Sequence, residues 1–507
     1  MPLQPHTYSD EAKMATQNDQ LPSLPPELWQ SILSHLSNSD IKSLRLTCRR
    51  FGDSSLRIKR VFLSANPLNI EVFRAIADHK TFRHDVTEIV WDDARFIDVL
   101  ERSVSEYDMG EDEDEGCPIW FVKACKENLE QLEERKYGDV DRPDHIARAE
   151  QVAVQPSLRK CWEHHQYLLQ QQEYVLAAES DKDVFLYGLK RFPALKRITI
   201  TPTAHGWLFA PLYQTPMIRA FPKGFNYPIP RGWPTAGDHL APAPPFATPW
   251  QALDEIEKDK YRGFRIVTRV LATEEHNVSE LIMNANQLAT GLDCTIFDSS
   301  CEEYENLLRC SNTLVSNMQH IRVYATPISD PTHDGAEDSS AGSLRHFIPL
   351  QTIFPIDKWP KLRYFGLSRF LVSQSDIISL LSALPETLRS VELSFLRFVD
   401  DGGNWRDLLT EMRTQIRENR LWPDRDTTSK PRITIGVSPI HSRAGFGIWL
   451  EQEVRDFLYG EGEHPFDRVN LPKWGMGTVR DTFEPNHERP YVRRGVLRQL
   501  GYLKPNQ

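Results

Sequence analysis

An apolar pattern recurs along most of the 507-residue chain. In each copy an apolar residue is followed three and five positions later by two more, which indicates a short buried strand with a corner leading into it. Seven copies begin at Ile58, Val86, Leu195, Val278, Met318, Leu362 and Leu388. We therefore predict seven strands that lie in one parallel sheet in chain order, since neighbouring units must stack to bury each other's faces.

Helical patterns separate these strands. Residues 69–81 and 375–384 carry apolar side chains at intervals of three and four, as one buried helix face does. Alternating strands and helices favour a parallel sheet with helices behind it. Two of the intervals between strands, 28 and 26 residues, fall within the roughly 20–29 residue period of leucine-rich repeats. We predict an α/β fold over residues 59–430, an irregular leucine-rich-repeat-like α/β solenoid with long insertions; a nonrepetitive α/β domain is the alternative.

Two long insertions interrupt the predicted repeats. The first, 101–180, begins with an acidic loop that contains EDEDE at 111–115 and continues as helical, Gln- and Glu-rich sequence with a break at Pro156. The second, 207–250, has ten prolines between positions 211 and 249 and many aromatic residues, so regular helix or sheet is not expected there. It is either a structural flap over the core or a surface that binds another protein.

Both ends of the chain and one internal segment depart from the repeat pattern. Residues 1–20 are polar and lack an apolar period, so we predict a disordered tail. Residues 330–343 are rich in Ser, Asp and Gly and indicate a surface loop. Residues 431–507 are expected to form a C-terminal cap and tail, with a strand at 432–437 and an amphipathic helix at 447–459.

The stretch from Leu24 to Phe51 has the pattern of short helices. Pro25 and Pro26 suit a first helical turn, and Ser39 or Asp40 can cap a second helix. Apolar side chains recur at helical spacing, at Leu28, Ile32, Leu33, Leu36, Ile41, Leu44, Cys48 and Phe51. A unit of about 40 residues or fewer cannot bury so many by itself. We therefore expect part of this surface to await a partner; a hairpin docked on its own chain is the alternative.

The same stretch resembles the F-box in detail. The matching segments are LPPEL at 24–28, ILSHL at 32–36 and DIKSLRLTCRRF at 40–51. The resemblance implies a three-helix F-box over residues 21–58 that docks on the Skp-type adaptor of SCF (cullin-RING) ubiquitin ligases. The adaptor-binding residues that it implies are Leu24, Pro25, Leu28, Ile32, Leu36, Leu44, Cys48 and Phe51.

Three further segments are similar to fungal F-box proteins that carry a long irregular region after the box. They are WDDARF at 91–96, FNYPIPRGWP at 225–234 and PYVRRGV at 490–496. This resemblance extends over most of the chain. It implies no catalytic residue, and it leaves the protein that such a region binds unspecified.

Composition narrows the class of protein. The net charge of −11, from 71 acidic and 60 basic residues, argues against a protein that binds nucleic acid or an anionic membrane over its whole surface. Seven scattered cysteines without a CxxC pair favour a reducing compartment. The sequence contains neither a secretory signal nor an apolar run of about 18 residues. We expect a cytoplasmic or nuclear protein with no membrane or nucleic-acid partner.

The search for chemistry gives one weak candidate. Cys161 and His165 are four residues apart on one predicted helix face, a spacing that can hold a metal ion, but a site needs more ligands. GxxxxGK[ST], GxSxG and HExxH are all missing from the sequence. We therefore expect no enzyme, no cofactor and no metal site.

These expectations combine into one functional hypothesis. The F-box binds the Skp-type adaptor, and through it the cullin, while the C-terminal region binds a client protein whose identity the sequence does not reveal. Two alternatives stay open: an F-box scaffold that binds the adaptor without directing degradation, and an enzyme with a noncontiguous site.

Overall fold

The computed structural model describes most of the chain. The described residues are 25–36, 38–47, 56–96, 116–138, 145–233, 250–288, 291–297, 301–313, 320–324, 347–423, 425, 429–439, 445–484 and 488–491. The predicted tail at 1–20, the acidic run at 111–115 and the loop at 330–343 lie outside these ranges.

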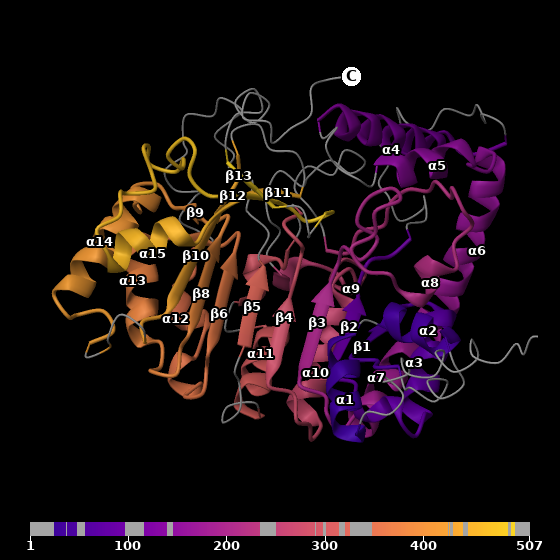
Figure 1. Cartoon of the computed structure of the whole chain (residues 1–507), viewed down its shortest axis with the longest axis horizontal. Coiled ribbons are helices and arrows are strands. Elements are labelled where there is room, and N and C mark those ends of the chain that lie inside the picture. Colours follow the sequence, from indigo (N-terminus) through magenta and orange to yellow (C-terminus); the bar gives the residue numbers. More distant parts are fainter. Residues whose placement is uncertain are drawn as a thin grey trace, which may run out of the picture.

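One continuous sheet organises the protein (Figure 1). It has eleven strands in the order β1-β2-β3-β4-β5-β6-β8-β10-β11-β12-β13, and pairing is parallel from β1 to β10. The parallel strands are β1 (Arg60–Leu63), β2 (Glu88–Asp92), β3 (Arg197–Thr201), β4 (Glu280–Met283), β5 (His320–Tyr324), β6 (Tyr364–Ser368), β8 (Ser390–Ser394) and β10 (Arg432–Val437). All seven predicted segments are therefore strands of one sheet, parallel and in chain order.

The apolar positions of the strands share a register. Val61 lies beside Ile89, Ile89 beside Ile198 and so on, and every member of this row up to Ile433 is buried. Since parallel strands cannot be joined by a tight turn, each connection crosses back over the sheet, mostly as a helix. These helices are α3 (Pro67–Asp78), α7 (Ser180–Arg191), α9 (Glu255–Asp259), α10 (Arg262–Thr273), α11 (Glu302–Thr313), α12 (Leu350–Ile353), α13 (Gln374–Ala383) and α14 (Trp405–Arg417).

Helix α10 approaches the sheet at a glycine. A Cβ on Gly263 would lie 2.4 Å from the indole nitrogen of Trp91 on β2 and 2.8 Å from Cγ of Asp93. Only glycine fits here, and its backbone N–H donates to the Asp93 carboxylate at 2.8 Å. The helix is thereby held against the end of β2.

The first insertion forms a helical unit with a core of its own. It consists of α4 (Ile119–Gly138), α5 (His145–Ala153) and α6 (Leu158–Ala177), and Pro156 separates the last two as predicted. Its buried residues pack with Phe225 and Tyr227 of the proline-rich insertion. In the described part of that insertion, Trp233 is buried as well, which favours the structural flap over the binding surface.

Two local expectations were wrong. The proline-rich stretch does contain a single helical turn, α8 (Pro216–Arg219), because Pro216 occupies the first turn, where a missing N–H is tolerated. The helix that we expected at 447–459 is limited to α15 (Gln452–Tyr459), because residues 447–450 belong to strand β11 (Phe446–Leu450). The strand prevails because FGIWL pairs antiparallel with β10 on one side and with β12 (Thr478–Asp481) on the other.

The remaining strands close the C-terminal end. Strand β10 coincides with the predicted strand and continues the parallel sheet, so the antiparallel cap begins at β11 and ends at β13 (Arg489–Pro490). Two short strands, β7 (Leu371–Val372) and β9 (Arg397–Phe398), form a separate parallel pair.

A buried ion pair joins the insertion to this cap. The Arg135 guanidinium on α4 bonds the carboxylate of Asp481 on β12, and both side chains are almost completely buried. The guanidinium also lies against the rings of Trp207, Phe446 and Phe483, at 5.2, 5.2 and 4.9 Å. A second pair, Arg148 with Glu484 at 3.2 Å, lies nearby and is also buried. The insertion and the C-terminal cap are therefore one packed body.

Replacing Arg135 with Ala should strongly destabilise the protein. The substitution leaves the Asp481 carboxylate buried without its counter-ion, a change that typically costs about 3–5 kcal/mol. The matched control is Arg159→Ala, which removes an exposed arginine that pairs with Glu163 within one helix and should cost less than about 0.5 kcal/mol. Urea unfolding followed by tryptophan fluorescence compares the midpoints; equal midpoints for the two variants would contradict the role of this pair.

Candidate functional site

The N-terminal stretch forms a helical hairpin at the β1 end of the sheet (Figure 1). Helix α1 (Pro26–His35) begins at the two prolines, as the sequence indicated, with Pro25 as its N-cap and Glu27 in its first turn. Helix α2 (Asn38–Thr47) begins one or two residues before the predicted caps Ser39 and Asp40.

The side chain of Asn38, the first residue of α2, forms two hydrogen bonds with the backbone of Arg57. Its amide donates to the Arg57 carbonyl at 2.6 Å and accepts from the Arg57 N–H at 2.9 Å. Arg57 lies just before β1, so these two bonds tie the hairpin to the sheet.

The apolar side chains of the hairpin divide into two sets. Leu33 on α1 and Ile41 on α2 are buried, with 9% and 1% of their surface exposed. Leu28 and Ile32 on α1 are 53% and 37% exposed. The expected partial exposure of the stripe is therefore observed for these two residues. Among the other predicted adaptor contacts, Pro25 is exposed, and Leu36 and Leu44 are half-buried.

Part of the predicted surface lies outside the described ranges. Leu24, Cys48 and Phe51 belong to this part, as does the region in which a third helix was expected. The structure also exposes a residue that the sequence analysis did not select: Leu46 on α2 is 89% exposed. The apolar stripe passes through Ile41, Leu44 and Cys48, so periodicity alone gave no reason to choose it.

Comparison with known families identifies this hairpin. The F-box-like family model matches residues 21–59. The chain is an F-box domain-containing protein. No curated protein and no solved structure matches it. The match covers the hairpin and the segment that leads into β1, and it suggests an adaptor or substrate-recognition role in SCF-type complexes.

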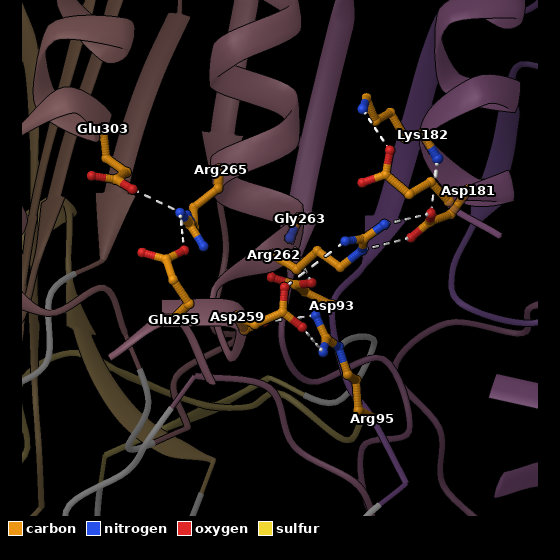
Figure 2. A network of polar contacts seen from close by, with 11 residues as sticks. Asp93, Arg95, Asp181, Lys182, Glu255, Asp259, Arg262, Gly263, Arg265 and Glu303 are labelled. Atoms are coloured by element: carbon orange, nitrogen blue, oxygen red, sulfur yellow. Dashed lines mark hydrogen bonds and ion pairs between the residues drawn. The ribbon is translucent and has the colours of Figure 1, made fainter. Parts of the chain in front are cut away.

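A polar network lies outside the F-box, at the C-terminal end of β2 (Figure 2). Asp93 accepts from the Trp233 indole N–H at 2.8 Å and from Gly263 N–H at 2.8 Å. Burial raises the pKa of Asp93, although Arg95 opposes this shift. Arg95 in turn pairs with Asp259 at 2.7 Å.

The arginines of α10 extend this network to the neighbouring helices. Arg262 contacts both oxygens of Asp181 on α7, at 3.2 and 3.1 Å. Arg265 pairs with Glu303 on α11 at 3.0 Å and with Glu255 on α9 at 2.9 Å. These contacts join four helices, so we interpret the network as a structural joint.

A second buried group contains two polar atoms without partners. Oδ2 of Asp92 and Nε2 of His205 lie 4.0 Å apart, and neither has a hydrogen-bond partner among the described residues. The other ring nitrogen of His205 contacts the Tyr227 hydroxyl at 2.9 Å. Burial raises the pKa of Asp92 to about 8 and lowers that of His205 to about 3. Between about pH 3 and pH 8, Asp92 is therefore protonated and His205 neutral, so both side chains are uncharged.

The cysteine and histidine that the sequence singled out are core residues. Cys161 and His165 are both buried, and His165 stacks on Trp162 with ring centroids 5.7 Å apart. In the ranges that the structure describes, no group of three or more His, Cys, Asp or Glu side chains is arranged to hold a metal ion. Within the same ranges, no helix is long and apolar enough to cross a membrane.

The Asp92–His205 pair should make the stability of the F-box protein depend on pH. The folded state keeps the Asp92 proton up to about pH 8, whereas an unfolded aspartate loses it near 3.8. An unfolded histidine takes up a proton below about 6.5, which buried His205 does not, so the two effects cancel between about 4 and 6.5. Above 6.5 only the Asp92 effect operates, and the pair should lower the free energy of unfolding by up to about 1.4 kcal/mol per pH unit until pH 8.

The variant Asp92→Asn tests this effect, because asparagine does not titrate. Urea midpoints of both proteins at pH 6.5 and pH 8 should diverge, with the variant gaining about 2 kcal/mol relative to the wild type over this interval. Parallel pH profiles would show that Asp92 is already ionised at pH 6.5.

Proposed function

We propose that this protein is a substrate-receptor subunit of an SCF (cullin-RING) ubiquitin ligase. Its F-box binds the Skp-type adaptor and thereby joins the cullin. The region after the F-box, which we interpret as an irregular leucine-rich-repeat-like solenoid, binds a client protein. The receptor itself performs no catalysis in this proposal.

The exposure of Leu28 and Ile32 is the observation that supports the proposal most directly. They are large apolar residues on a helix whose inward side is already filled by Leu33. Exposed apolar surface of this kind gains free energy when a partner covers it, about 25 cal/mol per Å² of area removed from water. Both residues also occupy positions that the F-box resemblance implies for adaptor contact.

The fold supports a division of labour between the F-box and the sheet. Residues 60–490 include all the strands of the main sheet, which bury their apolar faces against their own helices. Loss of apolar side chains from the exposed side of α1 should therefore leave the sheet folded. Transfer of ubiquitin to a tethered client is accelerated by proximity, since tethering raises the effective concentration of the client.

Replacing Leu28 and Ile32 with Ala should weaken adaptor capture about ten- to a hundredfold. The two side chains are already partly covered, so their further burial is worth about 1.5–3 kcal/mol in total. Pull-down of purified Skp-type adaptor measures capture, and circular dichroism melts check that the fold is retained.

A matched control uses apolar residues of similar exposure on the insertion. Ile146→Ala and Val154→Ala remove side chains that are also exposed but lie far from the F-box in the sequence. This variant should capture the adaptor as the wild type does. Undiminished capture by the α1 variant would remove the adaptor assignment. If the wild type captures the adaptor and cullin but no client is turned over in cells, the non-degradative scaffold is the better description.

A further inference from the structure

A row of positive side chains lies where the parallel strands begin. Lys59, Lys196, Arg363 and Arg389 each immediately precede a strand, namely β1, β3, β6 and β8, and each side chain is exposed. We call these four residues the basic row. In Figure 1 the strand starts form the lower edge of the sheet, and the F-box lies at the β1 end of this edge.

The backbone of the sheet fixes the basic row in place. The carbonyl of Lys59 accepts from Thr87 N–H at 2.9 Å, and that of Lys196 accepts from Ser279 N–H at 2.8 Å. The carbonyl of Arg363 accepts from Arg389 N–H at 2.7 Å, and that of Arg389 from Arg432 N–H at 2.9 Å. All four residues therefore contribute the first acceptors of the parallel ladder. Their spacing is set by the strands and not by flexible loops.

The strand order gives the length of the basic row. Neighbouring strands are about 4.8 Å apart, so Lys196 lies about 10 Å from Lys59, and Arg363 about 14 Å further on. Arg389 follows after one more strand. The whole row spans about 29 Å, the length of about nine residues of extended polypeptide.

Three carboxylates next to the row already pair with other arginines. At the first strand position Glu88 pairs with Arg60 at 2.8 Å, and Glu280 pairs with Arg197 at 2.5 Å. Glu451 pairs with Arg432 at 3.3 Å. Among the described residues, no carboxylate forms an ion pair with any member of the basic row. Within the described part of the chain, these four cations thus have no ion-pair partner, on one edge of a protein whose net charge is −11.

We propose that the basic row binds an extended, Asp- and Glu-rich polypeptide segment that runs across the starts of the strands. This inference rests on the proposed function, because the segment would belong to the client protein. Carboxylates on alternate residues of an extended chain repeat about every 6.6 Å, which suits cations spaced at one to three strands. The row begins beside the F-box, so a client held there would lie next to the adaptor.

A nucleic acid is the less suitable occupant. Strong binding to a nucleic acid typically neutralises about six to ten phosphates, more than four side chains in a single line supply. The overall negative charge also repels a dense polyanion at longer range. A protein segment with spaced carboxylates avoids both difficulties.

The test measures binding of a fluorescein-labelled peptide of about 12 residues that alternates Glu and Ser, by fluorescence anisotropy on the full chain. The wild type should bind it at low ionic strength and more weakly at physiological salt, because exposed ion pairs are screened. A quadruple variant, in which each residue of the basic row is replaced by Gln, should bind the peptide about tenfold to a hundredfold more weakly. Its substitutions are Lys59→Gln, Lys196→Gln, Arg363→Gln and Arg389→Gln. Two double variants carry half of these changes each, at Lys59 and Lys196 or at Arg363 and Arg389. Each should lose part of the affinity for the peptide, and they replace the quadruple variant in the test if it does not fold.

A control variant carries the same change of charge at exposed positions on other elements. These are Lys123, Arg159, Lys160 and Arg309, each replaced by Gln, and peptide binding should stay within about twofold of the wild type. Equal losses in the control and row variants, or binding of the acidic peptide no tighter than that of a Gln and Ser peptide, would overturn the proposal. So would tighter binding of a single-stranded RNA of equal charge through the same four residues.

Adaptor capture separates this proposal from the proposed function. The quadruple row variant should capture the Skp-type adaptor normally, and the Leu28/Ile32 variant should bind the acidic peptide normally. If the wild type binds the peptide through the row but its adaptor capture does not depend on Leu28 and Ile32, the F-box assignment fails and the basic row stands. If adaptor capture behaves as expected and the peptide results do not, only the basic row is refuted.

Discussion

The parallel backbone ladder from β1 to β10 is the interaction on which the other features depend. Each strand begins at the same level as its neighbour, so the apolar rows that start at Val61 and Leu63 continue across the sheet and are buried by the crossing helices. The same alignment brings the strand starts, and with them the basic row, to one edge. A shift of one residue in any pairing would turn the apolar row of that strand to the opposite face of the sheet.

Charged residues connect the parts that the ladder does not join. Arg262 and Arg265 tie α10 to α7, α9 and α11, and Arg135 ties the insertion to the C-terminal cap. Buried ion pairs contribute little net stability compared with apolar side chains of the same size, but removing one partner is costly. Their role here is to hold insertions of irregular length in a single arrangement on a regular sheet.

The F-box is connected to the sheet by the two hydrogen bonds between Asn38 and Arg57. Asn38 fixes α2 to the segment before β1, and the exposed side of α1 carries Leu28 and Ile32. An apolar surface on a small unit at the end of a large sheet suits an attachment point, since its partner can cover it without disturbing the core. The basic row starts beside this apolar surface at the β1 end and runs away from it along the edge of the sheet, so the two different kinds of surface adjoin at Lys59.

The sequence by itself determined the positions of the eight parallel strands, the chain order of the first seven, and the first two F-box helices. Those features depend on local periodicity and on helix-start residues such as Pro25 and Pro26. Both signals arise between residues that are close together in the sequence. It also selected Leu28 and Ile32, but it placed them in one stripe with Leu33. Only the tertiary structure, which buries Leu33 and leaves the other two exposed, separates them.

The tertiary structure alone decided features that join distant residues. Arg135 and Asp481 are 346 positions apart, and no local pattern relates them. Residues 447–450 were expected to begin a helix, yet pairing with strands on both sides makes them part of a strand. The basic row is equally invisible along the chain, because Lys59 and Arg389 become members of one line only when the register of the intervening strands is set.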